Sequence, residues 1–264
     1  MSSASAPENE FVQSLARGLA VIEAFGRGRQ ALTLSDVARR ANVSRAAARR
    51  LLHTLVILGY AAFDGKHFEL RPRVLGLGFA YMSSMGVWDV AQPFLEDLVR
   101  ETRESCSVAV LDGTEIVHVI RLPAAKRLMS IAVKVGDRLP AHASAMGRVQ
   151  LAALSPEELD HYFEVAEIAA VTEKTVTDAR KLRAILAEVK RQGYSEVDGE
   201  LEIGLRALAV PVADRAGRVV ASIALSTLGS NKAPKGRGNP LLAPLQACAA
   251  RIHEALLRMP ALGH

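Results

Sequence analysis

The first third of the chain carries short apolar segments separated by turn residues. In the first segment, apolar side chains recur at intervals of three or four residues from Leu15 through Leu19 to Phe25. This spacing predicts a helix whose apolar face is buried, with Ser14 placed as its N-cap. The run GRGRQ that follows is poor in apolar side chains and ends the helix.

Two more helices follow at close spacing. The segment TLSDVARRA predicts a short second helix that Thr33 or Ser35 could cap. After a tight turn, Ser44 is placed to cap a third helix that runs to about Leu58 and ends at Gly59, a residue type typical of helix C-termini. The sequence therefore predicts a helix-turn-helix.

A hairpin is predicted directly after the third helix. The runs YAAF and HFEL have the composition of short strands, and Asp64-Gly65-Lys66 joins them. Asp-Gly between two such runs is a strong hairpin signal. Three helices followed by a hairpin indicate a winged helix-turn-helix.

The third helix separates apolar from basic side chains. On a helical wheel, one side carries apolar residues that we expect to face the first two helices. These residues are Ala47, Ala48, Leu51, Leu55 and Leu58.

Arg45, Arg49 and His53 form a stripe on the far side, with Arg50 on its flank. Such a stripe could be only a solvated face. Against that, it has no acidic partner at i±4 and begins at the end of the helix that reaches base edges in helix-turn-helix docking. We therefore expect this helix to contact DNA.

Residues at or next to the start of the third helix are expected to touch bases, and cations of the second helix and the wing to bind phosphates. The candidate DNA-contacting residues are Thr33, Ser35, Arg39, Arg40, Ser44, Arg45, Ala46, Arg49, Arg50, His53 and Lys66.

The charge distribution agrees with this division of the chain. Residues 1–86 contain eleven Lys and Arg against six Asp and Glu, whereas residues 87–264 contain twenty-two of each. The whole excess of +5 therefore lies in the first third. Such asymmetry is typical of a polyanion-binding module joined to a neutral one, although uneven surface solvation could also produce it.

A connecting helix is expected next, followed by a longer helix from about Trp88. The connector carries Val74, Leu75, Phe79 and Met82 on one apolar face. This face could pack on the C-terminal domain or on a second subunit. A dimer would match two DNA half-sites one helical turn apart, about 34 Å.

From Ser107 the pattern alternates strands and helices. SVAVLDG and EIVHVIRL predict a hairpin, LMSIAVKV another strand, and LRALAVPVAD with VVASIALST a later pair. SAMGRVQLAAL, SPEELDHYF, TDARKLRAILAEVKRQGY and a segment near the C-terminus predict helices. The expected fold class is α/β (α+β), with a largely antiparallel sheet and flanking helices.

Several classes of function are disfavoured by composition. No apolar run approaches about 18 residues, so no membrane span is expected, and the first residues lack the features of a signal peptide. Cys106 near His118 or His142 could be proposed as a nucleophile with its base, but a buried structural thiol is the more ordinary interpretation. We expect a cytoplasmic protein that is not an enzyme and needs no cofactor or metal.

Several segments in order resemble one known family. The winged module, VGDRLPAHASAMGRVQLAAL and QGYSEVDGELEIGLRALAVPVADRAGRVVASIALS are similar to the IclR family of bacterial transcription regulators. RAAARRLL, LRPRVLGLGFAYMSS, AQPFLEDL, ESCSVAVLDG and LPAHASAMGRV resemble the subgroup that controls β-ketoadipate, protocatechuate and 4-hydroxybenzoate catabolism. The resemblance runs from about Ser14 to Leu257.

The resemblance implies a winged-helix N-terminal domain and a GAF-like effector domain. It also implies a homodimer or dimer of dimers, and control of binding to a double-stranded DNA operator by a small carboxylate. We expect a polar tail over residues 1–10, the winged helix-turn-helix over 11–72, a linker helix for dimerisation over 73–87 and the effector domain over 88–260. The alternative is an IclR-type regulator of another carboxylate catabolic pathway.

The resemblance also implies where the effector binds. The family's effector meets backbone N–H groups at a helix start, here residues 144–147, and donors there suit a carboxylate. His142, Arg148 and Arg206 could add charge, although Arg206 could instead pair with Glu200 or Glu202. The implied effector-binding residues are Leu128, Ile131, Leu139, His142, Ser144, Ala145, Met146, Arg148, Asp198, Arg206, Ala207, Ala224 and Ser226.

Three positions depart from the family pattern. Many members have a polar or thiol side chain where this chain has Ala207, a serine at Ala224, and a smaller residue at Met146. These departures predict a more apolar pocket, suited to an aromatic or longer-chain acid.

Overall fold

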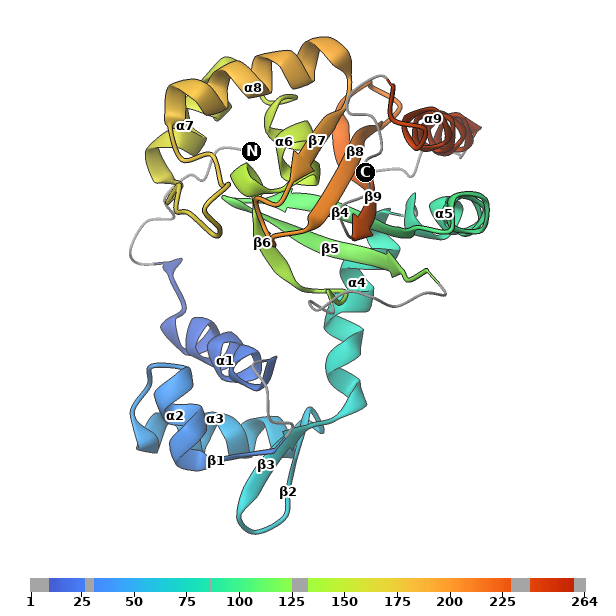
Figure 1. The fold of residues 1–264 in the computed structure, drawn as a ribbon. Helices are drawn as coiled ribbons and strands as arrows, with labels where there is room; N and C mark the ends of the chain where they lie inside the picture. Colours follow the sequence, from blue (N-terminus) through green and yellow to red (C-terminus); the bar gives the residue numbers. More distant parts are fainter. Residues whose placement is uncertain (1–9, 27–30, 86, 125–132, 229–237, 259–264) are drawn as a thin grey trace. The chain divides into compact units, whose positions relative to one another are not determined.

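The chain divides into two compact units, Met1–Met85 and Gly86–His264. The structure, a computed structural model, describes residues 10–26, 31–85, 87–124, 133–228 and 238–258. Figure 1 shows that each unit has its own helices and its own sheet. Each unit also has its own core, one around Leu52 and the other around Leu186.

The N-terminal unit is a winged helix-turn-helix, as predicted. Its three strands form an antiparallel sheet in the order β1-β3-β2 (Figure 1). The first of these strands was not predicted, because three residues are too few to show an alternating pattern. The elements are α1 (Gln13–Glu23), η2 (Ala24–Gly26), β1 (Ala31–Thr33), α2 (Leu34–Arg40), α3 (Arg45–Ile57), β2 (Ala61–Phe63), β3 (His67–Leu70), η3 (Pro72–Val74) and α4 (Leu75–Met85).

Local sequence signals fix the ends of the helices in this unit. Thr33 caps α2 in a capping box with Asp36, and the Ser44 hydroxyl accepts the N–H of Ala47 at the start of α3. Asn42 adopts φ 50° in the turn between the two helices, a conformation that asparagine tolerates better than most residues. Gly59, at φ 78°, ends α3 as predicted.

The buried face of α1 differs from the prediction. The helix has Val12 rather than Ser14 at its N-cap position, and Leu15 is 63% exposed. The core receives Val21 from a different face of the helix, together with Phe25, which belongs to the predicted face and lies in η2. The helix thus carries two apolar stripes, and the sequence alone does not show which one is buried.

The apolar face of α3 is also shifted from the predicted one. Leu52 and Leu55 are buried with Ala48, whereas Leu58 is half exposed because it is the C-cap residue beyond the last turn. The core of the unit closes between these side chains and Phe68 of the wing.

The C-terminal unit is built on a six-stranded sheet in the order β6-β5-β4-β9-β8-β7, and every pairing is antiparallel. The predicted α+β architecture is confirmed. Its elements are α5 (Val87–Thr102), β4 (Ser105–Asp112), β5 (Glu115–Leu122), β6 (Arg138–Pro140), η4 (Ala141–Ala143), α6 (Ala145–Leu151), α7 (Pro156–Val165), α8 (Ala179–Gln192), β7 (Ser195–Asp198), β8 (Leu205–Ala213), β9 (Val219–Leu228) and α9 (Leu242–Arg258).

Helices cover both faces of this sheet. Figure 1 shows α6, α7 and α8 on one side and α5 with α9 on the other. Alternation along β9 sends Ala224 toward α6 and the flanking Ile223 and Leu225 toward α5 and α9. The Sγ of Cys248 in α9 lies 3.5 Å from the backbone oxygen of Phe94 in α5. We call these the α6 side and the α9 side.

Most of the strand predicted at 128–135 lies outside the described residues. The described part, 133–135, is not a strand, and the edge strand is β6 instead. The helix α7 begins as predicted, with a capping box between Ser155 and Glu158 and Pro156 at its first position.

Candidate functional sites

The basic stripe of α3 lies on the outer surface of the N-terminal unit. Arg45, Ala46, Arg49 and Arg50 are exposed, opposite the buried leucines. Among the residues that the structure describes, none of these three arginines forms an ion pair with a carboxylate. The stripe therefore keeps its charge available for a polyanion.

Two carboxylates of this unit, Asp36 and Asp64, are held by local hydrogen bonds. A hydrogen bond from the Thr33 hydroxyl lowers the pKa of Asp36, and backbone N–H groups of His67 and Lys66 lower that of Asp64. Asp36 also pairs with Arg39 at 2.9 Å. Both carboxylates stay ionised, but their hydrogen bonds are made within their own turns. They therefore do not neutralise the arginines of the α3 stripe.

Some of the other candidate DNA-contacting residues are exposed, and others make contacts within the N-terminal unit. Ser35, Ser44 and Lys66 are exposed, with Lys66 at the tip of the wing. Arg40 donates to the backbone oxygen of Ala24 at 3.0 Å, a structural contact that sequence reasoning did not foresee.

His53 contacts the wing directly. Its ring lies edge-on to those of Phe63 and Phe68, with centroids 6.1 Å away in each case. This contact joins the outer face of α3 to the hairpin.

The second candidate site lies on the α6 side of the C-terminal sheet. Gln150, in the last turn of α6, hydrogen-bonds to Ala109 O, Leu111 N and the Ser222 hydroxyl. One turn earlier, the oxygen of Met146 accepts the Ser222 hydroxyl. The helix therefore lies across β4 and β9.

The start of α6 has the donors that the sequence suggested. The Ser144 hydroxyl accepts the N–H of Gly147 at 2.8 Å. The N–H groups of Ala145 and Met146 come too early for an intrahelical acceptor, and none is found for them among the described residues.

Serine and alanine make up the sheet surface beyond Ser222 on the α6 side. Two adjacent rows run across β4, β9 and β8, and every side chain in them is small. The rows are Ser107–Ala224–Ala209 and Ser105–Ser226–Ala207. The second row is half-buried, whereas Ala209 and Ala224 are fully buried, so packing does not seal this end of the sheet. We call these six residues the Ser/Ala floor.

Arg148 and His142 are held in contacts that stabilise the fold and are not available at this floor. Arg148 is 2% exposed and forms a bidentate ion pair with Glu200, at 2.6 and 2.8 Å. Desolvation lowers the pKa of His142, which favours its neutral form, and its Nε2 lies 3.0 Å from the backbone oxygen of Ala169. The ion pair joins α6 to the loop before β8, and neither group adds free charge to the site.

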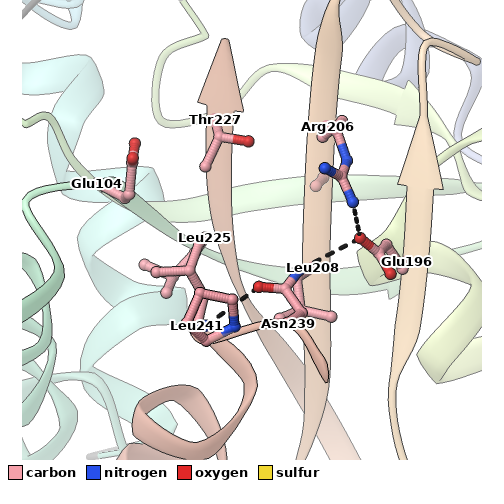
Figure 2. Close-up of a pocket in the computed structure, with 10 residues that line it drawn as sticks. Glu104, Glu196, Arg206, Leu208, Leu225, Thr227, Asn239 and Leu241 are labelled. Carbon is pink, nitrogen blue, oxygen red and sulfur yellow. Dashed lines mark hydrogen bonds and ion pairs between the residues drawn. The ribbon is translucent and has the colours of Figure 1, made fainter. Parts of the chain in front are cut away.

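Arg206 and Asp198 lie on the opposite side of the sheet from the Ser/Ala floor. Their neighbours Ala207 and Val197 pack against the α6 cluster, so alternation turns Arg206 and Asp198 toward the α9 side. Figure 2 shows Arg206 bonded to Glu196, a partner that the sequence did not suggest; their closest atoms are 2.5 Å apart.

Asn239 also donates to Glu196, at 3.2 Å. These side chains line a cavity of about 100 Å³ on the α9 side (Figure 2).

The remaining predicted positions can be placed in part. Leu139, in β6, packs against the cluster around α6. Leu128 and Ile131 lie outside the described residues.

Sequence reasoning missed one cation on the α6 side. Arg121 donates to the Ser107 hydroxyl at 2.7 Å. The sequence signal for Arg121 was weak, because an arginine near the end of a predicted strand is as typical of an exposed strand end as of a binding site.

Cys106 and His118 are not arranged as a nucleophile and its base. Cys106 points to the α9 side near Cys248, whereas His118 pairs with Ala109 and points to the α6 side. Burial raises the pKa of the Cys106 thiol to about 12, so a thiolate is disfavoured. In the described part of the chain, no group of His, Cys, Asp and Glu could hold a metal ion.

We expect Gly147→Ala to destabilise the C-terminal unit. A Cβ at Gly147 would lie 2.2 Å from the backbone oxygen of Ala141, so α6 and η4 would have to separate. Overpacking of this kind costs about 1–3 kcal/mol. Urea unfolding followed by the fluorescence of Trp88, the one tryptophan, should show a lower midpoint.

Gly26→Ala is the control for this substitution, because its Cβ meets nothing within 4 Å. An unchanged midpoint for Gly147→Ala would contradict the close packing of α6 on η4.

Comparison with known proteins identifies the family. The family model described as the C-terminal region of the bacterial transcriptional regulator IclR matches residues 79–254, and that of the IclR helix-turn-helix domain matches residues 14–65. The chain belongs to the IclR family. It is therefore a helix-turn-helix transcriptional regulator, as the sequence predicted.

Three similar proteins are informative. The Pca regulon regulatory protein of Pseudomonas putida is 43% identical over 83% of this chain and 75% of its own length. The p-hydroxybenzoate hydroxylase transcriptional activator of Acinetobacter baylyi is 39% identical over 81% and 80%. The crystal structure of an IclR homologue from Microbacterium hydrocarbonoxydans, complexed with 4-hydroxybenzoate, is 29% identical with a TM-score of 0.82, over 92% of this chain and 99% of that one.

In the described residues, no helix of this IclR-family protein combines the length and apolar character needed to cross a bilayer.

Proposed function

We propose that this regulator binds its operator through α3 and that a small carboxylate, bound on the Ser/Ala floor, controls this binding. The observation that carries the proposal is the floor itself. Two rows of small side chains on central strands, half of them incompletely buried, leave room for a flat ligand where a core would place large residues. The N–H groups at the start of α6 would meet its acid group.

The effector we propose is an aromatic acid or another acid of the β-ketoadipate pathway. Met146, Ala207 and Ala224 make the surroundings apolar, which suits a ring better than a two-carbon acid. The regulators of the pca regulon and of p-hydroxybenzoate hydroxylase, and the homologue crystallised with 4-hydroxybenzoate, support the same class. The alternative is an acid of another catabolic pathway.

We also propose a homodimer or a dimer of dimers. The second apolar stripe of α1, with Leu15 and Leu19, is exposed. The connector α4 exposes Leu75 and Phe79, the latter by 71%. Apolar surface of this extent supports contact with a second copy, and two copies would match two operator half-sites.

Control of DNA binding requires that the effector prefer one of two arrangements of the dimer. Capture of the acid at the start of α6 would shift this helix, and the connector would then reset the separation of the two α3 helices. A coupling free energy of about 1–3 kcal/mol would change operator occupancy by roughly 5- to 150-fold.

A thermal-shift screen of the full chain tests the effector class. We expect 4-hydroxybenzoate or protocatechuate at about 100 times its Kd to stabilise the protein by about 2.7 kcal/mol, because the ligand binds only the folded state. For a protein of this size, that corresponds to a rise in Tm of roughly 5–10 °C.

Acetate at the same concentration is the control and should leave the Tm unchanged. A larger shift with acetate than with either aromatic acid would contradict the proposed effector class.

A further inference from the structure

We propose that Arg121 is the side chain that recognises the charge of the effector, an inference that rests on the proposed function. It would make this regulator select acids over uncharged compounds of the same shape. Three observations about its placement support this role.

The first observation is the side of the sheet on which Arg121 lies. It is paired with Ser107 in the β4–β5 ladder, and Ser107 is paired with Ala224 in the β4–β9 ladder. Ala109, two residues along β4 from Ser107, and Ala224 both pack against the α6 cluster. Arg121 therefore extends the first row of the Ser/Ala floor by one strand.

The second observation is how the guanidinium is held. Its Nη1 donates to the hydroxyl of Ser107 at 2.7 Å, and Ser107 is 2% exposed. The bond draws the guanidinium from β5 toward β4. Neighbouring strands are about 4.8 Å apart, so the charge lies about one strand from Ala224 in β9. An aromatic acid whose ring lies on the Ser/Ala floor would have its carboxylate within reach of the Arg121 guanidinium.

The third observation concerns burial and charge. Arg121 is half-buried, and the resulting desolvation lowers its pKa, yet arginine stays protonated at neutral pH. A cation partly removed from water binds an anion more strongly than an exposed one does, and the planar guanidinium suits a carboxylate.

The other cations considered for this role are placed differently. Arg148 is neutralised by Glu200, and Arg206 points to the α9 side, where it pairs with Glu196. His142 has a lowered pKa and is held against a backbone oxygen.

The test compares an acid with its uncharged amide, 4-hydroxybenzoate against 4-hydroxybenzamide, by calorimetric titration of the full-length protein. The wild type should prefer the acid. Arg121→Met should weaken binding of the acid by about tenfold to a hundredfold, since charge-assisted hydrogen bonds are lost, and should leave binding of the amide nearly unchanged.

Two further variants separate recognition from folding. Arg121→Lys keeps a positive charge but lacks the planar guanidinium, so it should recover part of the preference for the acid over the amide. Ser107→Ala removes only the hydroxyl that holds the guanidinium, and should reduce the preference less than Arg121→Met does. Arg191→Met, which removes an exposed arginine paired with Glu188 on α8, is the matched control.

Each result decides between definite alternatives. If Arg121→Met binds the acid as the wild type does, backbone donors carry the recognition and the inference is wrong. The inference is also wrong if the acid and the amide weaken equally, because Arg121 would then only support the fold. If the wild type binds neither aromatic acid nor amide, the proposed effector class fails, and the role of Arg121 fails with it.

Discussion

Replacing Arg45 and Arg49 together by alanine should lower operator affinity by about a hundredfold or more. Each arginine that contacts a base or phosphate contributes about 1–3 kcal/mol of binding free energy. The loss should also reduce the dependence of log K on log salt by about 2, because roughly one counterion is released for each phosphate neutralised. The fold should be retained, since both side chains are exposed and alanine favours helix.

Fluorescence anisotropy on a DNA fragment selected by the wild-type protein from a random library, at several salt concentrations, measures both effects. Arg180→Ala with Arg191→Ala is the matched control, because it removes the same charge from exposed positions on α8. Wild-type affinity and salt dependence in the Arg45/Arg49 variant would show that α3 is not the DNA-reading helix. An alternative role for the winged helix is to bind protein rather than DNA. The triple variant Ser44→Ala, Arg45→Ala and Arg49→Ala tests this, since loss of DNA binding with an intact fold would exclude the protein-binding role.

Replacing Arg148 by methionine should destabilise the C-terminal unit by about 3–5 kcal/mol. The substitution leaves the carboxylate of Glu200 buried without its bidentate partner, and an uncompensated buried charge is costly. A loss of that size lowers the Tm of a domain of this size by roughly 6–20 °C.

Urea or thermal unfolding of the full chain, followed by Trp88 fluorescence, measures this change. The double variant Arg148→Met with Glu200→Gln should recover part of the stability, because it removes both charges, and the cycle gives their coupling. Arg191→Met should cost little, since its pair with Glu188 is exposed. Equal stability of Arg148→Met and Arg191→Met would contradict a buried, structurally important ion pair.

Local signals in the sequence predicted the elements of the fold well. Ser44, Ser155 and Gly59 each act through a side chain or backbone conformation within a few residues, so the helix ends were readable. The choice of buried face was less readable. Helix α1 has two apolar stripes, and only the packing of α3 and the wing decides that Val21 is buried and Leu15 is not.

The candidate site was harder to predict because it depends on which side of the sheet a residue faces. Arg206 and Ala207 are adjacent in sequence, yet Arg206 faces the α9 side, whereas Ala207 faces the α6 side as part of the Ser/Ala floor. Arg148 looked like a ligand-binding cation until its pairing with Glu200, 52 residues away, was seen. Such long-range pairings set the role of each charge, and no local pattern reports them.

The side-chain amide of Gln150 limits how α6 could respond to an occupant. Its donors and acceptor fasten the last turn of the helix to β4 and β9 at three points. A helix fastened at its last turn cannot slide as a piston without breaking those bonds, so a shift of its first turn has to pivot about them. The motion available to a sensor built this way is that of a lever, in which a small tilt at the fastened turn becomes a larger displacement at Ser144.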